Sequence, residues 1–327
     1  MITMEKTLNV QKVKLFLSTF TLVPIYGVFL LLLAFTTPDF FNAFNLRSTV
    51  TFASILGFLV IGETLVILTR GIDLSVGSIA SLSTVITAAL MKFYGKELNY
   101  EVIFFLCFAL STLAGLGIGT INGLFVSYLN VPPFISTLSG LLIGSGFAYF
   151  ILRGVPTTLA IASFRNITRG RILFMPIPFL VLLAVSILFW YLLTRTSWGR
   201  YIYAVGGNEY ASFLSGIDTK KVVLSAYQVS GILAAIGGVM LAALSNAGFP
   251  RAAEGYEFRA ITAAVIGGVS LSGGEGNLFS ALLGIFILTT LGKSIIFWQI
   301  SPFMEGIFIG GVLLAAMYAS VKGRKRR

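Results

Sequence analysis

Four ionisable side chains stand within or beside long apolar stretches of the sequence: Glu63, Asp73, Lys293 and Glu305. A charge at bilayer depth costs about 2.5–3.5 kcal/mol or more, so such residues are candidates for function. A proton relay would require histidines or a dense series of carboxylates, and the chain contains no histidine. We therefore expect these side chains to form pairs or to face a water-filled cavity.

Asp73 belongs to the motif Gly71-Ile-Asp-Leu-Ser-Val-Gly77, which follows an apolar run. Its carboxylate is expected to cap the next helix, to pair with Arg70 or to lie near water, and Ser75 is a second possible cap. Two interpretations stay open here: a cap that fixes a re-entrant bend, and direct contact with a substrate. The candidates for a pathway or a re-entrant motif are Glu63, Asp73, Ser75, Ser272 and Lys293.

Several chemistries are excluded by residue type. The chain has no histidine and one cysteine, Cys107, which rules out Cys/His zinc sites, disulfides within the chain and His-dependent triads. The Gly292-Lys293-Ser294 triplet is not a phosphate-binding loop, because the glycine required five residues earlier is Ile287. We expect no catalytic residue, no metal site and no cofactor bound by this chain.

The composition is that of an integral membrane protein. Of the 327 residues 57% are hydrophobic and 11% are charged, and the mean hydropathy is +0.94. Soluble domains carry roughly a quarter charged residues. The net charge of +11 fits loops that orient a membrane protein better than it fits binding to a nucleic acid, which we do not expect as a partner.

Apolar runs of about 20 residues predict ten membrane-spanning helices in an all-α fold. The expected spans are about 15–35, 50–69, 74–91, 102–128, 133–151, 176–193, 222–244, 260–272, 277–298 and 303–320. The third and the eighth are short or interrupted by glycine, so we expect them to be broken or re-entrant. Glycines four residues apart, at 115, 119 and 123 and at 140 and 144, predict closely packed helices.

Loop charge predicts the orientation of these spans. Both the N-terminal tail and the C-terminal segment Lys322–Arg327 are basic, and an even number of spans places both on the cytoplasmic side. The segment Arg153–Arg171 carries four arginines and falls on the outer side, against this rule. These arginines are either ordinary solvated charges or a docking site for an external protein.

Two motif pairs predict a fold built from two related halves. The motif at 71–77 matches Gly268-Val-Ser-Leu-Ser-Gly-Gly274, and Val131-Pro-Pro-Phe134 resembles Ile300-Ser-Pro-Phe303. The second glycine motif is 34 residues from its proline (Gly268 to Pro302), against 62 for the first (Gly71 to Pro133). The shorter spacing lacks roughly one span, so the second proline motif should face the opposite side of the membrane. Related halves are a known basis of transporter folds. The expected organisation is a single permease domain, residues 1–327, with a tail (1–14), an N-terminal half (15–193), a polar segment (195–221), a C-terminal half (222–320) and a basic tail (321–327).

The polar segment between the sixth and seventh spans predicts a short capped helix on the cytoplasmic side. Gly206-Gly207-Asn208 is typical of a turn, and Asn208 suits the start of a helix. About two helical turns follow before Gly216, a residue typical of a helix C-terminus. A permease driven by a separate ATPase needs such a stiff element, whereas an ion-coupled secondary carrier does not. A membrane enzyme is a more distant alternative.

Four motifs in order closely resemble the permease subunits of bacterial ribose/xylose/galactose-type ATP-binding cassette (ABC) importers. These motifs lie at residues 71–78, 204–217, 255–277 and 309–318, and the resemblance runs from about Phe40 to the C-terminus. The wider superfamily also contains nucleoside and branched-chain amino acid permeases. Arg70 stands where such permeases commonly have glycine.

The resemblance implies the following partners and roles. Two permeases pair in the bacterial inner membrane, two cytoplasmic ATPase domains that carry ATP and Mg²⁺ bind beneath them, and a periplasmic binding protein delivers a monosaccharide. Residues 206–217 would be the coupling helix, with Asn208 as its cap, Glu209 facing the ATPase, and Ala211 and Leu214 in apolar contact. Gly206, Gly207 and Gly216 also belong to the coupling-helix residues. Gly207 and Gly216 would permit the chain to turn sharply into and out of this helix.

Overall fold

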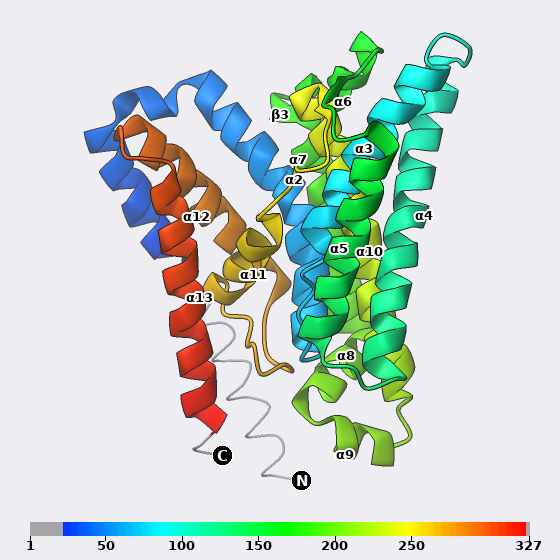
Figure 1. Cartoon of the computed structure of the whole chain (residues 1–327). Coiled ribbons are helices and arrows are strands. Elements are labelled where there is room, and N and C mark those ends of the chain that lie inside the picture. The colour runs from blue at the N-terminus through cyan, green and yellow to red at the C-terminus, as the bar shows by residue number, and fades with distance from the viewer. Residues whose placement is uncertain (1–21, 325–327) are drawn as a thin grey trace.

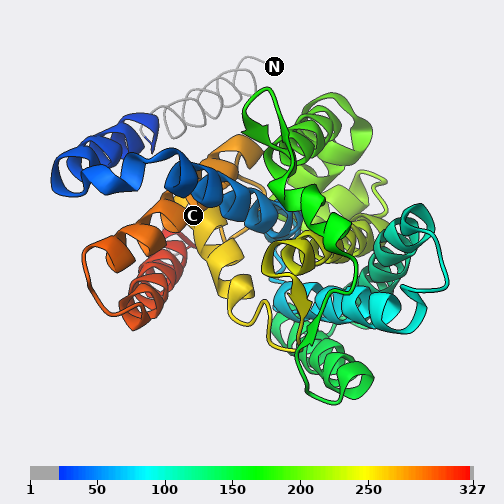
Figure 2. The same cartoon turned by 90° about the horizontal axis from the view of Figure 1, so that it is seen from above.

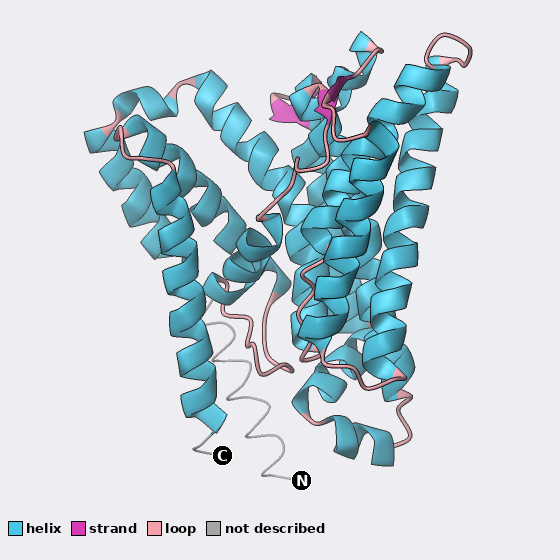
Figure 3. Cartoon of the chain, in the orientation of Figure 1, coloured by secondary structure: helices cyan, strands magenta, loops and turns pink. Residues whose placement is uncertain are grey.

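The computed structural model describes residues 22–324 as a bundle of helices with four two-residue strands (Figures 1 and 3). The first helix is described over Leu22–Thr36. The long helices are α2 (Ala43–Leu68), α3 (Val76–Tyr94), α4 (Tyr100–Ser127), α5 (Pro133–Leu152), α7 (Ile177–Arg195), α10 (Thr219–Ser245), α12 (Leu278–Phe297) and α13 (Phe303–Arg324). The shorter ones are η1 (Pro38–Phe41), η2 (Ala162–Arg165), α6 (Asn166–Arg169), α8 (Ser197–Gly207), α9 (Glu209–Leu214) and α11 (Tyr256–Ile266).

The predicted all-α membrane fold is confirmed. Seven of the described helices are long and apolar enough to cross a membrane, and the first helix and α13 add shorter apolar stretches. The predicted eighth span is the short α11, and a loop at 267–277 follows it. The third is preceded by non-helical residues, with α3 beginning only at Val76. The tail at 1–14, the start of the first span and residues 325–327 lie outside the described residues, and α13 continues to Arg324, beyond the predicted end at 320.

Helix α2 is at the centre of the bundle, buried along most of its length. It packs against α10, α12, α11 and α7. Helices α4 and α10 approach each other closely, and the reason is glycine. A Cβ on Gly115 would lie 2.2 Å from the carbonyl oxygen of Gly231, and one on Gly119 would lie 2.4 Å from that of Tyr227. The predicted small-residue face of α4 is therefore confirmed as a surface of direct backbone contact.

A second group of helices stands beside this core. Helices α11, α12 and α13 pack on one another, and α11 and α12 also contact α2 (Figure 2). The first helix joins them, since the Tyr26 hydroxyl and Thr290 Oγ1 lie 2.9 Å apart. Arg259 of α11 and Glu305 of α13 form a partly buried ion pair of 2.9 Å, which confirms the expected pairing of Glu305.

The two ends of the bundle differ in structure. At one end lie α8, α9 and the α4–α5 loop, which holds the first proline motif (Figure 1). At the other end lie the α12–α13 loop with the second proline motif, and the short strands. Strand β1 (Thr157–Thr158) pairs with β4 (Ala247–Gly248), and β2 (Arg171–Ile172) pairs with β3 (Met175–Pro176), both antiparallel. The proline motifs thus face opposite ends, as their spacing predicts.

Candidate functional site

Asp73 is fully buried between α2, α4 and α10, where hydroxyl groups and backbone satisfy its carboxylate. Oδ1 accepts from the backbone N–H and the hydroxyl of Ser75 at 3.0 and 2.6 Å, and Oδ2 accepts from the hydroxyl of Ser230 at 2.8 Å. The backbone N–H of Asp73 donates to Glu63 Oε1 at 3.1 Å. Asn122 of α4 donates to Ser75 Oγ at 2.9 Å. The network therefore ties the 71–75 loop to three helices at once.

This geometry decides between the alternatives for Asp73. Its carboxylate accepts the N–H of Ser75, the residue just before α3, and so fixes the bend that leads into that helix. The expected side-chain cap is not formed, because neither Asp73 nor Ser75 accepts a hydrogen bond from an N–H of α3. The pairing with Arg70 is wrong, because the Arg70 side chain points to the end of α8 instead. The carboxylate is also shielded from bulk solvent, because Asp73 has no exposed surface. Glu63 Oε2 is buried without a hydrogen-bond partner among them.

Arg70 connects the end of α2 to the end of α8. Its Nε donates to the carbonyl oxygen of Gly206 at 2.6 Å and a terminal nitrogen donates to that of Gly207. Carbonyl groups at a helix C-terminus lack partners within the helix, and a cation there is favourable. The backbone of Arg70 is in the left-handed region, with φ 68°, a conformation that suits glycine better than arginine.

The second copy of the repeated motif, 268–274, meets the end of α2 at this junction. The N–H of Gly274 donates to the carbonyl oxygen of Leu68 at 2.9 Å, and the Tyr203 hydroxyl of α8 donates to the carbonyl oxygen of Gly276 at 3.1 Å. Burial raises the pKa of Tyr203 to about 12. Ser272 lies in this loop, where its N–H donates to Ser270 Oγ at 3.2 Å. Arg70 at the end of α2 and the 267–277 loop therefore both contact α8.

Helix α9 begins at the predicted cap. The Asn208 side chain accepts from the N–H of Ala211 at 3.0 Å, and Gly216 has φ +82° just after the helix. The six-residue helix Glu209–Leu214 exposes Tyr210, Phe213 and Leu214 to between 64% and 72%. Tyr210 and Phe213 were not among the predicted contact residues, although Tyr210 precedes Phe213 by three residues and Leu214 by four, a spacing that indicates one face.

The predicted turn at Gly206-Gly207-Asn208 needs a correction. Both glycines are the last residues of α8, and the chain turns at Asn208 alone, with φ −157° and ψ 104°. Gly206 serves close packing rather than turning, since a Cβ there would lie 1.7 Å from the Leu68 carbonyl oxygen. Gly207 has open space around it and provides no sharp entry. Asp218 caps the next helix, and its hydrogen bond from Lys221 lowers the pKa of the carboxyl.

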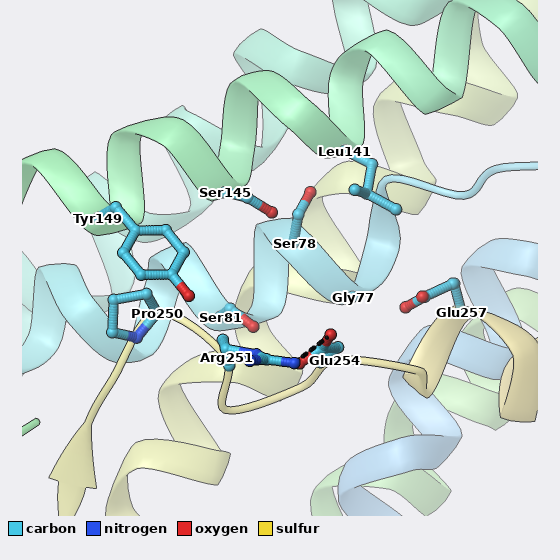
Figure 4. Close-up of a pocket in the computed structure, with 10 residues that line it drawn as sticks. All are labelled: Gly77, Ser78, Ser81, Leu141, Ser145, Tyr149, Pro250, Arg251, Glu254 and Glu257. Atoms are coloured by element: carbon cyan, nitrogen blue, oxygen red, sulfur yellow. Dashed lines mark hydrogen bonds and ion pairs between the residues drawn. The ribbon is translucent and has the colours of Figure 1, made fainter. Parts of the chain in front are cut away.

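A cavity of about 260 Å³ opens between α3, α5 and the loop before α11 (Figure 4). Hydroxyl groups of Ser78, Ser81, Ser145 and Tyr149 line one part of the cavity. The ion pair of Arg251 with Glu254 lines another part, and Arg251 Nη2 lies 2.8 Å from Glu254 Oε1. Glu257 reaches the cavity past Gly77, where a Cβ would lie 2.1 Å from its Oε2.

The cavity residues were not predicted from the sequence. The available signal was the recurrence of serine at 75, 78 and 81, since a spacing of three places side chains on one face of a helix. Lys293 belongs elsewhere: its ammonium donates to the Asn45 carbonyl oxygen at 3.3 Å and to Ser48 Oγ, near the start of α2. The structure thus gathers Glu63, Asp73 and Ser75, and separates Ser272 and Lys293 from them. No metal-binding cluster of three His, Cys, Asp or Glu occurs within residues 22–324.

Seven helices that are long and apolar enough to cross a membrane define a multi-pass helical membrane protein. Residues 45–317 match the family described as branched-chain amino acid transport system / permease component, and the chain belongs to this family. It is 33% identical over 296 residues to the ribose import permease RbsC of Haemophilus influenzae, covering 89% of this chain and 90% of that one.

Two further relatives are sugar permeases by name. The D-allose transport system permease AlsC of Escherichia coli is 33% identical over 307 residues, covering 89% of this chain and 90% of its own. The fructose import permease FrcC of Rhizobium meliloti is 34% identical over 330 residues, covering 96% and 88%. No solved structure matches the chain. The expected resemblance to permeases of sugar importers is thereby confirmed.

Proposed function

We propose that the chain is the membrane-spanning permease subunit of an ABC importer that carries a monosaccharide across the bacterial inner membrane. The observation that carries the proposal is the similarity, over about nine-tenths of the chain, to permeases named for ribose, allose and fructose. Energy comes from a separate ATPase subunit that holds ATP and Mg²⁺, and sugar comes from a periplasmic binding protein. A second permease, of the same or a sister sequence, completes the pore.

The coupling role belongs to α9 and the segment around it. The helix exposes three large apolar side chains and the carboxylate of Glu209 at the end of the bundle. Apolar anchors with a polar rim are typical of contacts between protein subunits. Arg70 and the 267–277 loop connect α8 to the ends of α2 and α11. Force on α9 therefore has a direct hydrogen-bonded route to helices on both sides of α2. This end of the bundle is the cytoplasmic one.

The cavity between α3 and α5 is the proposed path for sugar. Its four hydroxyl groups and its carboxylates can exchange hydrogen bonds with sugar hydroxyls, which both donate and accept. The cavity needs few side chains that hold the sugar tightly, because the binding protein supplies the affinity for it. In this role the hydrogen bonds of the buried Asp73 hold the helices that line the pathway in place, and Asp73 itself does not contact the sugar.

Reconstitution of the chain with its ATPase and binding protein tests the proposal. We expect ATP-dependent uptake of one labelled pentose or hexose, and we expect Glu209→Arg together with Leu214→Asp to abolish it. The matched control is Glu97→Arg with Leu98→Asp in the exposed α3–α4 loop, at the end of the bundle opposite α9 (Figure 1), which should leave ATP-dependent uptake intact. Unchanged uptake in the α9 variant would refute the coupling role.

Two alternatives are separated by the same system. Uptake of a nucleoside or a branched-chain amino acid, with no monosaccharide transported, would assign the chain to another branch of the family. Uptake driven by a proton or sodium gradient without any ATPase would establish an ion-coupled carrier.

A further inference from the structure

The β2–β3 hairpin presents two large apolar side chains from a strained turn. Arg171 pairs with Pro176 and Ile172 with Met175, which leaves Leu173 and Phe174 as a two-residue loop. Their φ values are 48° and 70°, and their side chains are 87% and 85% exposed. Turns with two positive φ values favour Asn-Gly, and bulky residues rarely occur there. In a loop that faces water, Asn-Gly would be the more stable pair at these positions. The presence of Leu-Phe instead indicates that this surface is covered.

The position of the hairpin indicates what covers it. Strand β3 ends at Pro176 and α7 begins at the next residue, and the N–H of Ile177 donates to the carbonyl oxygen of Gly170 at 3.1 Å. Leu183, Ile187 and Leu188 expose the outer face of α7 to between 42% and 53%, as a lipid-facing helix does. The hairpin lies at the end of α7 (Figure 1), and at the rim of the bundle when seen from above (Figure 2).

The charge around the hairpin complements lipid headgroups. Residues 153–176 contain arginine at 153, 165, 169 and 171 and no Asp or Glu. None of these arginines forms an ion pair with another described residue. Basic residues beside an apolar insertion are the usual combination for binding at a membrane interface, because phosphates pair with the cations while the apolar groups enter the acyl boundary.

We propose that the hairpin is a membrane-interface anchor. Leu173 and Phe174 insert into the leaflet opposite α9, and Arg169 and Arg171 contact lipid phosphates beside them. The occupant of this surface is therefore the lipid bilayer. The anchor fixes the height of α7 in the membrane. Contact with lipid phosphates also explains why four arginines occur at the end of the bundle opposite α8 and α9, where loop charge alone does not predict them.

Site-directed spin labelling of the full chain in vesicles of phosphatidylethanolamine and phosphatidylglycerol tests the anchor. In a Cys107→Ala background, nitroxides are placed separately by Leu173→Cys and Phe174→Cys. The water-facing reference is Ser163→Cys in η2, and the lipid-facing reference is Leu188→Cys in α7. We expect both hairpin labels to collide more with oxygen than with a water-soluble nickel chelate, as the α7 label does, by several-fold relative to the η2 label.

A second variant keeps the hairpin while removing its apolar tip. Leu173→Asn with Phe174→Gly supplies the residues that this turn favours, so folding is preserved, and a nitroxide on Ile172→Cys should then gain access to the nickel chelate. Arg169→Gln with Arg171→Gln should shift the Phe174→Cys label toward water in the same vesicles. Hairpin labels as accessible to nickel as the η2 label would overturn the proposal. So would labels that become protected only when a soluble binding protein is added.

Discussion

Two adjacent glycines at the end of α8 give the sharpest test of the junction that joins it to α2. A Cβ on Gly206 would lie 1.7 Å from the Leu68 carbonyl oxygen and 2.6 Å from the Gly274 nitrogen, whereas a Cβ on Gly207 meets nothing within 4 Å. Ordinary contacts between heavy atoms are about 3.5 Å. Gly206→Ala therefore requires α8 to shift by roughly 2 Å from α2, since 3.5 less 1.7 is about 1.8.

The cost of that shift is worked from overpacking. Extra methyl groups in packed interiors typically cost about 1–3 kcal/mol, and both obstructing atoms here are backbone atoms that no rotamer change can remove. We expect Gly206→Ala to fall at the upper end of this range and to weaken the Arg70 hydrogen bonds to α8. Gly207→Ala should be neutral, or more stable by about 0.5–1 kcal/mol because the unfolded chain loses freedom.

The assay compares the two purified variants by thermal unfolding in one detergent and by ATP-dependent uptake after reconstitution. We expect a lower midpoint and lower uptake for Gly206→Ala alone. If the two variants behave alike, or if Gly206→Ala matches the unmodified chain, the close contact of α8 with α2 is wrong.

The other predictions concern single contacts. Arg70→Ala should be less stable than Arg70→Gly by about 1–2 kcal/mol in thermal unfolding, because alanine keeps the left-handed strain that glycine relieves; equal midpoints would contradict the φ of 68°. Ser230→Ala removes one donor to Asp73 and should cost about 1 kcal/mol, whereas Asp73→Ala leaves buried donors of Ser75 and Ser230 unpaired at about 1–3 kcal/mol each and should lower the unfolding midpoint much further; equal effects would refute the network. The pKa of the Asp218 carboxyl is lower in the folded protein than in the unfolded chain. The stabilisation that Asp218 gives to the first turn of α10 is therefore fully present above its unfolded-state pKa, and it is lost as pH falls through its folded-state pKa. The protection of amides in that turn, measured as their exchange rate relative to the unfolded chain at the same pH, should therefore fall in acid, and Asp218→Asn, which keeps a capping side chain, should remove this pH dependence.

The sequence predicted those features whose signals are local. Apolar runs located the spanning helices, and the position of Asn208 and Gly216 located α9, because caps act within one turn of a helix. The glycine spacing of α4 predicted close packing, since such spacing creates a smooth face without regard to the partner helix.

Features that depend on residues far apart in the chain could not be predicted from the sequence. The segment Ser197–Gly207 was not expected to form a helix, because its glycines favour turns unless contacts such as that of Gly206 with Leu68 fix them. The target of Arg70 was missed because the carbonyl groups it binds lie 136 and 137 residues away. The cavity arises where the loop at 250–257 folds against α3 and α5, and no local pattern encodes that meeting.

The contact of Gly115 with Gly231 has a mechanical consequence. At Gly115 and Gly119 the backbones of α4 and α10 meet directly, so no side chain can slide or repack at these points, and the two helices form one stiff plate. Opening and closing must then occur at softer seams, where side chains rather than main chains separate the helices. The seam between α2 and the group of α11, α12 and α13 has that character, and hinge motion is expected there while the α4–α10 plate moves as a single piece.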